Sequence, residues 1–325
     1  MVSSLVRFLR QEYLEGFIAQ GGSKIKLYTS TEATRRALFF RELSQTARDL
    51  GYAVAEVDAV SVARLHQLNN LYHALTARLD LEGLFKRYCD QVIRALGYNP
   101  ADLPPHQAFL DWAAEVHGRV PESLRSEIRL KLETDIFRNR AVSRSFATVA
   151  LQLSADALGA TDRRLLPEDR ELLFAWLRGQ PVALRDLRKF HVFTRVDRYN
   201  ARLFLGSLVE LARLAGYRGL FITVDNLEVL LTRRETGRPL YGRAAREEFY
   251  ESLRQFIDDL DTLHHLMLVL GFQRDLVDNP TLGFRSYAAL WLRIQSEIEG
   301  TRPNLFRDFL DLDRLSAEAA APVAG

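Results

Sequence analysis

Residues 30–37, Ser-Thr-Glu-Ala-Thr-Arg-Arg-Ala, stand where a polypeptide could hold a phosphate group. They follow a strand-like run at 24–28 and lead into a helix, expected from about 35 to 50, that has one apolar face. A strand followed by a short turn and a helix N-terminus presents backbone N–H groups to an anion. The chemistry this stretch suggests is the binding or cleavage of a phosphate ester.

A loop of the form GxxxxGK[ST] meets definite demands of that chemistry. Its glycines let backbone amides curl around phosphate oxygens, its lysine reaches the terminal phosphates and its hydroxyl holds Mg²⁺. Laid on this register, the loop has no glycine and no lysine, and Glu32 places negative charge where phosphate would lie. The candidate residues of the loop are Ser30 and Arg35 at the glycine positions, Arg36 at the lysine, Ala37 at the hydroxyl, and Thr31 and Thr34 between them. Every key position is therefore altered.

A second strand-like run, 220–224, ends at Asp225 and Asn226. In a nucleotide-cleaving site, an aspartate in this place holds the metal's water shell and a following glutamate polarises the attacking water. Asn226 stands at the glutamate position, and an amide cannot act as a base. Asp225 has two interpretations, a magnesium ligand or the partner of Arg35 or Arg36 in an internal ion pair. Glu228 is expected to cap or pair at the following turn.

The densest group of cations lies in a loop rich in turn formers. It consists of Arg233, Arg234, Arg238, Arg243 and Arg246. Such a group is suited to DNA phosphates or to an acidic partner, whereas a solvated, mobile charged loop is the structural alternative.

The composition bounds the other possibilities. A chain of 325 residues, 47% of them hydrophobic, can bury a full α/β core, and its net charge of +2 gives no bulk basic field for nucleic acid. The single cysteine, Cys89, excludes an internal disulfide, and the seven histidines show no zinc-ligand spacing, so no metal site is expected. The longest apolar run, 266–272, is too short for a membrane span, and a cytoplasmic protein is expected.

The elements that would position these residues follow an α/β order. Residues 1–60 are expected to hold an N-terminal helix and the first βαβ unit, and 61–215 a helical insertion. Residues 216–315 would complete the sheet with strands at 220–224 and 266–272 and a last edge strand and turn within 305–315. The stretch 316–325 is low in complexity and is expected to be disordered.

Five stretches carry a resemblance to a known family. They read "GGSKIKLYTSTEATRRALFFRELSQTARDLGYAVAEVDA", "LLFAWLRGQPVALRDL", "AGYRGLFITVDNLEVLL", "REEFYESLRQFIDDL" and "GFRSYAALWLRI". In this order they resemble the ATP-binding proteins of BREX-type phage-defence islands, which are AAA-like P-loop ATPases. The resemblance implies an AAA-like P-loop NTPase α/β fold, a parallel-sheet core with a large helical insertion. In the family the first stretch holds an intact phosphate loop and the later one an Asp-Glu pair.

The resemblance also assigns further residues. It places Gln273 where such proteins put a polar residue that senses the γ phosphate. Arg285 and Arg293 lie where such proteins project an arginine finger into a neighbour, and a solvated helix face is the alternative. Relatives continue into a helical lid, which is expected to be missing or truncated here.

The function expected from these features is that of a catalytically degenerate, non-hydrolysing structural or regulatory subunit of a bacterial anti-phage defence complex. No cofactor is expected under this interpretation. The alternatives are an ATP- and Mg²⁺-binding protein with slow or interface-shared ATPase activity, and a DNA-binding module of the same system. The partners implied are other defence-system proteins, including an active P-loop ATPase homologue, in a homo- or hetero-oligomer, with DNA as a further candidate.

Overall fold

The computed structural model describes residues 2–298 and 304–320 and divides the chain into two compact units. Unit 1 is formed by the residues up to 78 together with those from 218 onward, and unit 2 by residues 79–217. The sequence-based boundaries of the insertion were 61 and 215. The difference at the first boundary concerns helix α3, Leu68–Thr76, which packs on strand β2 of the sheet and so clusters with unit 1.

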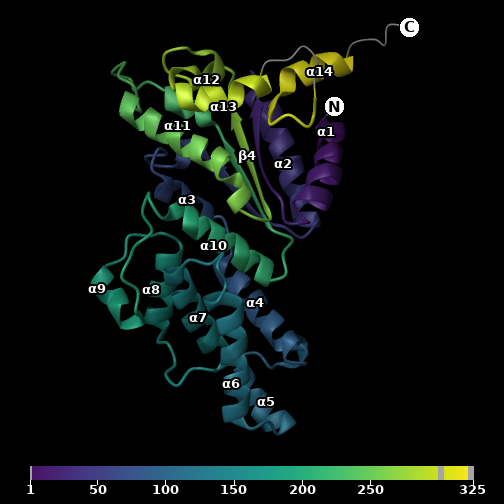
Figure 1. Cartoon of the computed structure of the whole chain (residues 1–325), viewed down its shortest axis with the longest axis vertical. Helices are drawn as coiled ribbons and strands as arrows, with labels where there is room; N and C mark the ends of the chain where they lie inside the picture. The colour runs from purple at the N-terminus through teal and green to yellow at the C-terminus, as the bar shows by residue number, and fades with distance from the viewer. Residues whose placement is uncertain (1, 299–303, 321–325) are drawn as a thin grey trace. The chain divides into compact units, whose positions relative to one another are not determined.

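A parallel five-stranded sheet forms the centre of unit 1 (Figure 1). Its strands are β1 Ser23–Thr29, β2 Ala53–Asp58, β3 Leu220–Asp225, β4 Leu266–Phe272 and β5 Phe309–Asp311. They lie in the order β2-β3-β4-β1-β5, and β1 pairs with β4 from Ser23↔Leu266 to Thr29↔Phe272. The predicted α/β fold with a parallel-sheet core is confirmed, and the edge strand expected within 305–315 is β5.

Three helical segments cover one face of the sheet. They are α1 Val2–Leu9, the π-helix η1 Arg10–Phe17 and α2 Ala33–Asp49. Figure 1 shows α1 and α2 side by side next to the strands. Their apolar stripes bury Leu9, Leu14 and Phe39 against Tyr28 of β1 and Val269 of β4. Because side chains alternate across a strand, the residues that share a face with Tyr28 are those that α2 can reach.

The opposite face is covered by helices that come late in the chain. These elements are η6 Leu227–Leu231, α11 Arg243–Asp258, α12 Asp275–Asp278, η8 Phe284–Ser286 and α13 Ala288–Ile298. Helix α14 Leu312–Ala320 follows edge strand β5, and its Leu312 packs into the core that α1 and α2 form on the first face. Figure 1 shows α11 on the other side of β4 from α2. An aromatic chain joins this layer to the sheet, since Phe284 packs edge-on against Phe272 of β4 at 5.2 Å and against Tyr250 of α11 at 5.4 Å.

Unit 2 is helical throughout its described elements. They are α4 Leu81–Ala95, the 3-10 helix η3 Pro100–Asp102, α5 Phe109–His117, α6 Pro121–Leu132, the π-helix η4 Glu133–Phe137, α7 Arg144–Leu158, α8 Pro167–Leu177, α9 Leu184–Leu187, the 3-10 helix η5 Arg188–Phe190 and α10 Ala201–Leu214. Aromatic side chains are buried in the core of this unit. One of them, Trp176, donates from Nε1 to the carbonyl of Thr194 at 2.8 Å. No described helix of the chain combines the length and the apolar character needed to cross a bilayer.

The C-terminal stretch differs from its expectation. Disorder was expected over 316–325, yet α14 extends to Ala320, and residues 321–325 lie outside the described part of the chain. Alanine and glutamate are strong helix formers, so the Ser-Ala-Glu-Ala-Ala run continues a helix that β5 has already anchored.

Candidate functional site

The loop between β1 and α2 occupies residues 30–32, at the carboxyl end of a strand that has neighbours on both sides. Open parallel sheets bind ligands at this edge. None of the residues 30–37 adopts a positive φ in the structure. The chain therefore makes an ordinary strand-to-helix turn rather than the glycine-dependent coil that wraps a phosphate.

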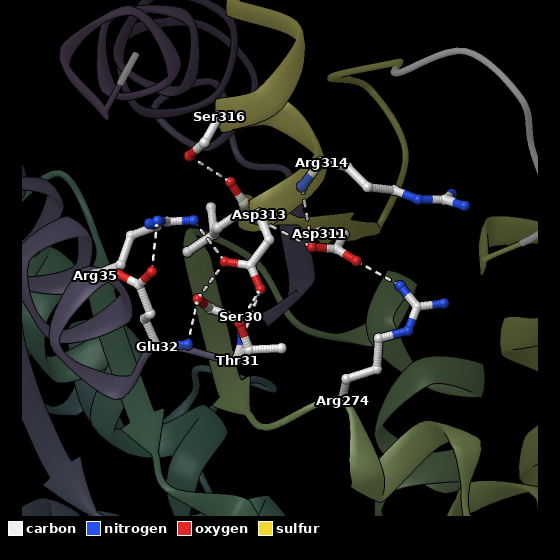
Figure 2. A network of polar contacts seen from close by, with 10 residues as sticks. Ser30, Thr31, Glu32, Arg35, Arg274, Asp311, Asp313, Arg314 and Ser316 are labelled. Atoms are coloured by element: carbon white, nitrogen blue, oxygen red, sulfur yellow. Dashed lines mark hydrogen bonds and ion pairs between the residues drawn. The ribbon is translucent and has the colours of Figure 1, made fainter. Parts of the chain in front are cut away.

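The polar groups of this loop converge on one carboxylate, that of Asp313 at the start of α14. Figure 2 shows the Asp313 side chain turned toward Ser30, Thr31 and Arg35. Its Oδ1 accepts from Ser30 Oγ at 2.7 Å and from Arg35 Nη1 at 2.6 Å. Its Oδ2 accepts from the backbone N–H of Thr31 at 2.6 Å and from Thr31 Oγ1 at 2.8 Å. Both oxygens of the carboxylate are thus engaged by the loop.

The charge state of Asp313 fits this arrangement. Partial burial acts to raise the pKa of the carboxyl, but the hydrogen bonds from Thr31 and Ser30 and the charge of Arg35 outweigh it and hold the pKa below its ordinary value. Asp313 is therefore an anion at neutral pH. The negative charge expected from Glu32 does not fill the loop, because the Glu32 side chain is mostly exposed and binds Arg35 Nη2 at 2.9 Å.

Arg36, at the position of the catalytic lysine, is completely buried and points to the end of β3. Its Nε donates to Asp225 Oδ1, and its Nη2 donates to Asn226 Oδ1 at 2.8 Å and to Glu228 Oε1 at 3.0 Å. Of the two interpretations of Asp225, the structure contains the ion pair, and Arg36 rather than Arg35 is the partner. Glu228 pairs at the turn as expected.

Burial dominates the electrostatics of this cluster. It raises the pKa of the Asp225 carboxyl, and the adjacent Arg36 guanidinium opposes that shift without cancelling it. Asp225 fits here only because residue 271 of β4 is a glycine, since a Cβ at that position would collide with Asp225 Oδ1. The Nη1 group of Arg36 has no hydrogen-bond partner among the described residues.

Asn226 replaces glutamate for a reason visible in the backbone. Its φ of 63° lies in the left-handed region, which asparagine tolerates better than glutamate. Its side chain also donates from Nδ2 to Asp58 Oδ1 at 3.0 Å, at the end of the neighbouring strand β2. The amide therefore bridges Arg36 and Asp58, which a carboxylate could not do.

The remaining candidates of the loop lie apart from these two clusters. Thr34 and Ala37 are exposed on the outer side of the first turns of α2. Gln273 follows β4 as expected, but it is its backbone N–H that reaches the site, donating to Glu228 Oε2 at 3.1 Å. The loop thus contributes Ser30, Thr31, Arg35 and Arg36 to internal contacts.

The two arginine-finger candidates have partners inside unit 1. Arg293 of α13 donates from Nε to Asp258 Oδ1 of α11 at 2.7 Å. Arg285 is exposed and its guanidinium lies 4.8 Å from the ring centroid of Trp291. Neither residue is brought to the Arg36 cluster or to Asp313 by any contact in the described structure.

The basic cluster forms a hairpin, called here the arginine hairpin (residues 232–240). The N–H of Arg234 donates to the carbonyl of Arg238 at 2.8 Å, and that of Leu240 to Thr232 at 2.8 Å. Arg233, Arg234 and Arg238 are exposed on it. Two arginines that the sequence placed in this basic cluster lie outside the hairpin. Arg243 begins α11 and pairs with Glu247, and Arg246 is buried. Arg233, Arg234 and Arg238 therefore lie on an ordered turn and not on a structureless loop.

The arrangement does not fit a bound Mg²⁺–ATP. Ala37 offers no oxygen to a metal, Arg36 neutralises the acids at the end of β3, and Asp313 takes the donors of the loop. Across the described residues there is no group of three or more His, Cys, Asp or Glu side chains placed to hold a metal ion. Sequence reasoning missed Asp311 and Asp313, whose only signal was their position at the end of the last strand and just after it.

A strand-turn-helix at the end of β1 and an acid at the end of β3, on a parallel five-stranded sheet, define a P-loop NTPase-like α/β protein. Residues 167–324 match the family model described as BREX system ATP-binding protein BrxC/D. The expected resemblance to this BREX-type ATP-binding family is confirmed over that part of the chain. No curated protein matches the chain.

Proposed function

We propose that the protein is a non-hydrolysing member of a BREX-type phage-defence assembly, in which a P-loop fold serves a structural or regulatory role. The proposal combines the family match over residues 167–324 with the state of the residues that would do chemistry. Its partners are other proteins of the same system, an active ATPase of related fold among them.

One observation carries the proposal, the position of Arg36. In an active site a lysine here would reach the phosphates and leave the strand-end aspartate to the metal. Here the guanidinium binds Asp225, Asn226 and Glu228 at once. Glu228, in the turn after β3, is another carboxylate that could serve as a base, but its Oε1 accepts from Arg36 and its Oε2 from the Gln273 backbone N–H. Among the described residues, both carboxylates that β3 and the turn after it supply, Asp225 and Glu228, are thus bound to Arg36.

Phosphate release from ATP and Mg²⁺ by the purified chain tests this proposal. We expect no turnover above that of an Asp225→Asn preparation made in the same way, which controls for contaminating ATPases. We also expect no rise in melting temperature at millimolar ATP, because a ligand that binds only the folded state would raise it. Turnover by the wild-type chain that Asp225→Asn abolishes would show an active ATPase and contradict the proposal.

Contact with DNA is a second candidate function, supported by the arginine hairpin. Arg233, Arg234 and Arg238 are exposed on one ordered turn, and none of them forms an ion pair in the described structure. Guanidinium groups in this state can bind backbone phosphates, and such binding weakens steeply with salt.

The matching experiment measures duplex DNA binding at several salt concentrations. The triple variant Arg233→Gln/Arg234→Gln/Arg238→Gln should bind more weakly and with a shallower salt slope, by up to about three released counterions. A control with the same loss of charge, Arg7→Gln/Arg41→Gln/Arg140→Gln, removes exposed arginines elsewhere. Equal losses in both variants would indicate a bulk charge effect and exclude the hairpin as a DNA site.

A further inference from the structure

The segment 304–320, which contains β5 and α14, is attached to the rest of unit 1 by several charged contacts, among them Lys24–Asp308 at 2.6 Å, and two of these points of attachment carry the argument. The first is the buried ammonium of Lys26 in β1. Its Nζ donates to the carbonyls of Leu305, Phe306 and Arg307 at 3.1, 3.0 and 2.6 Å. The Lys26 side chain is completely buried, so these carbonyls replace its water.

The second point is the contact between Asp313 and the loop 30–35. Four donors meet one carboxylate there, a backbone N–H, two hydroxyls and a guanidinium. A phosphate oxygen would be recognised by the same kinds of donor. The planar carboxylate of Asp313, however, accepts hydrogen bonds from all four donors with only two oxygens.

Asp313 is itself held in place by a second acid. Asp311 ends β5, and its Oδ1 accepts the N–H of Asp313 at 2.9 Å and that of Arg314 at 3.3 Å, which caps the start of α14. The other oxygen of Asp311 binds Arg274, as Figure 2 shows. Asp311 thus helps to hold Asp313 in the orientation in which it binds the loop.

We propose that the loop 30–35 has become a carboxylate-binding site whose ligand is Asp313, and that this contact latches segment 304–320 onto the sheet. The proposal rests on the proposed function, in which the loop no longer serves ATP cleavage. The segment then takes the place of the phosphate, and an anion can enter the loop only when Asp313 leaves. Any partner that draws α14 away opens the loop at the same time.

Limited trypsin digestion tests the latch, because Arg307 is half-buried between the Lys26 contacts and β5. Cleavage after Arg307 requires the segment to open locally. We expect Asp313→Ala and the nearly isosteric Asp313→Asn to be cleaved there roughly ten- to a hundredfold faster than wild type, since the loop donors lose a charged acceptor. Asp261→Ala, which removes an exposed acid elsewhere in unit 1, should be cleaved at the wild-type rate.

Chemical rescue distinguishes a carboxylate site from a merely structural contact. Formate at constant ionic strength should slow the cleavage of Asp313→Ala, relative to chloride, and leave wild type unchanged. Wild-type cleavage rates in Asp313→Asn, with its circular dichroism unchanged, would overturn the latch, and so would rescue by inorganic phosphate but not by formate. ATP turnover by wild type would instead overturn the proposed function, so the two failures are distinguishable.

Discussion

Arg36 of α2 and Asp225 at the end of β3 form an ion pair in which the arginine is completely buried and the aspartate side chain is 17% exposed. The pair links the first helix after β1 to the strand two positions away in the sheet. In this protein the two residues that would normally share a nucleotide and its metal bind each other. The pair is therefore a contact that stabilises the folded state.

Removal of Arg36 should strongly destabilise the protein. Arg36→Met leaves Asp225 and Glu228 without their cation, and loss of one partner of a buried pair costs roughly 3–5 kcal/mol. The double variant Arg36→Met/Asp225→Asn should recover part of this loss, since one unpaired charge is then gone. Arg41→Met, at an exposed position of the same helix, should stay within about 0.5 kcal/mol of wild type. Urea unfolding measures all three, and a double variant no more stable than Arg36→Met would contradict the pairing.

Restoring the missing glutamate should not restore chemistry. Asn226→Glu puts a residue that tolerates the left-handed conformation less well than asparagine at this φ, and it sets a second carboxylate beside Asp58. We expect the backbone strain to cost at most about 1–2 kcal/mol, because asparagine already bears part of the cost of the left-handed conformation. No ATP turnover is expected, because Arg36 still binds Asp225. Asn226→Asp, which tolerates this φ, is the control for strain, and the appearance of turnover in Asn226→Glu would show that only the base was missing.

Burial of Lys26 should give the protein a distinct alkaline pH dependence. Burial lowers the pKa of Lys26 from near 10.5 to about 8. Below pH 8 the lysine is charged in both the folded and the unfolded state and contributes no slope. Between about 8 and 10.5 the unfolded state binds the proton that the folded state has released, so this group makes stability rise with pH, by at most about 1.4 kcal/mol per pH unit.

Lys26→Met isolates that contribution. Urea unfolding at pH 7.5, 8.5 and 9.5 should show that wild type gains stability relative to Lys26→Met as the pH rises. Lys86→Met, at an exposed position in unit 2, should keep the wild-type slope. Parallel pH profiles in wild type and Lys26→Met would mean that the ammonium stays charged in its ring of carbonyls.

The sequence allowed the sheet to be predicted, because its information is local. The run Leu-Met-Leu-Val-Leu-Gly-Phe of β4 is apolar on both faces, as a central parallel strand requires, and the structure buries all seven residues. The strand ends at Thr29, Asp58 and Asp225 follow from the change to polar residues there. Pairing order was less accessible, since β4 lies between β3 and β1 although it comes late in the chain.

The occupant of the loop could not be predicted in this way. Asp313 reaches Thr31 across 282 positions of sequence, and only the pairing of β5 with β1 brings them together. The pairing of Arg36 with Asp225 was accessible as one of two alternatives, because both residues were placed at the same edge of the sheet. Which of Arg35 and Arg36 turned inward depended on the helical phase of α2, and one residue along a helix rotates the side chain by about 100°.

Gly271 provides a last test of how the Arg36 cluster is built. Val224 pairs with Leu270, which sets Asp225 beside Gly271, and a Cβ there would collide with Asp225 and lie 2.7 Å from ring atoms of Phe40. Gly271→Ala should therefore cost about 1–3 kcal/mol, the usual range for overpacking a core. Gly242→Ala is the matched control, because its Cβ meets nothing within 4 Å and its φ of −67° suits alanine, so a change below about 1 kcal/mol is expected. If urea unfolding gives equal losses in both variants, the space beside Asp225 is not what requires glycine.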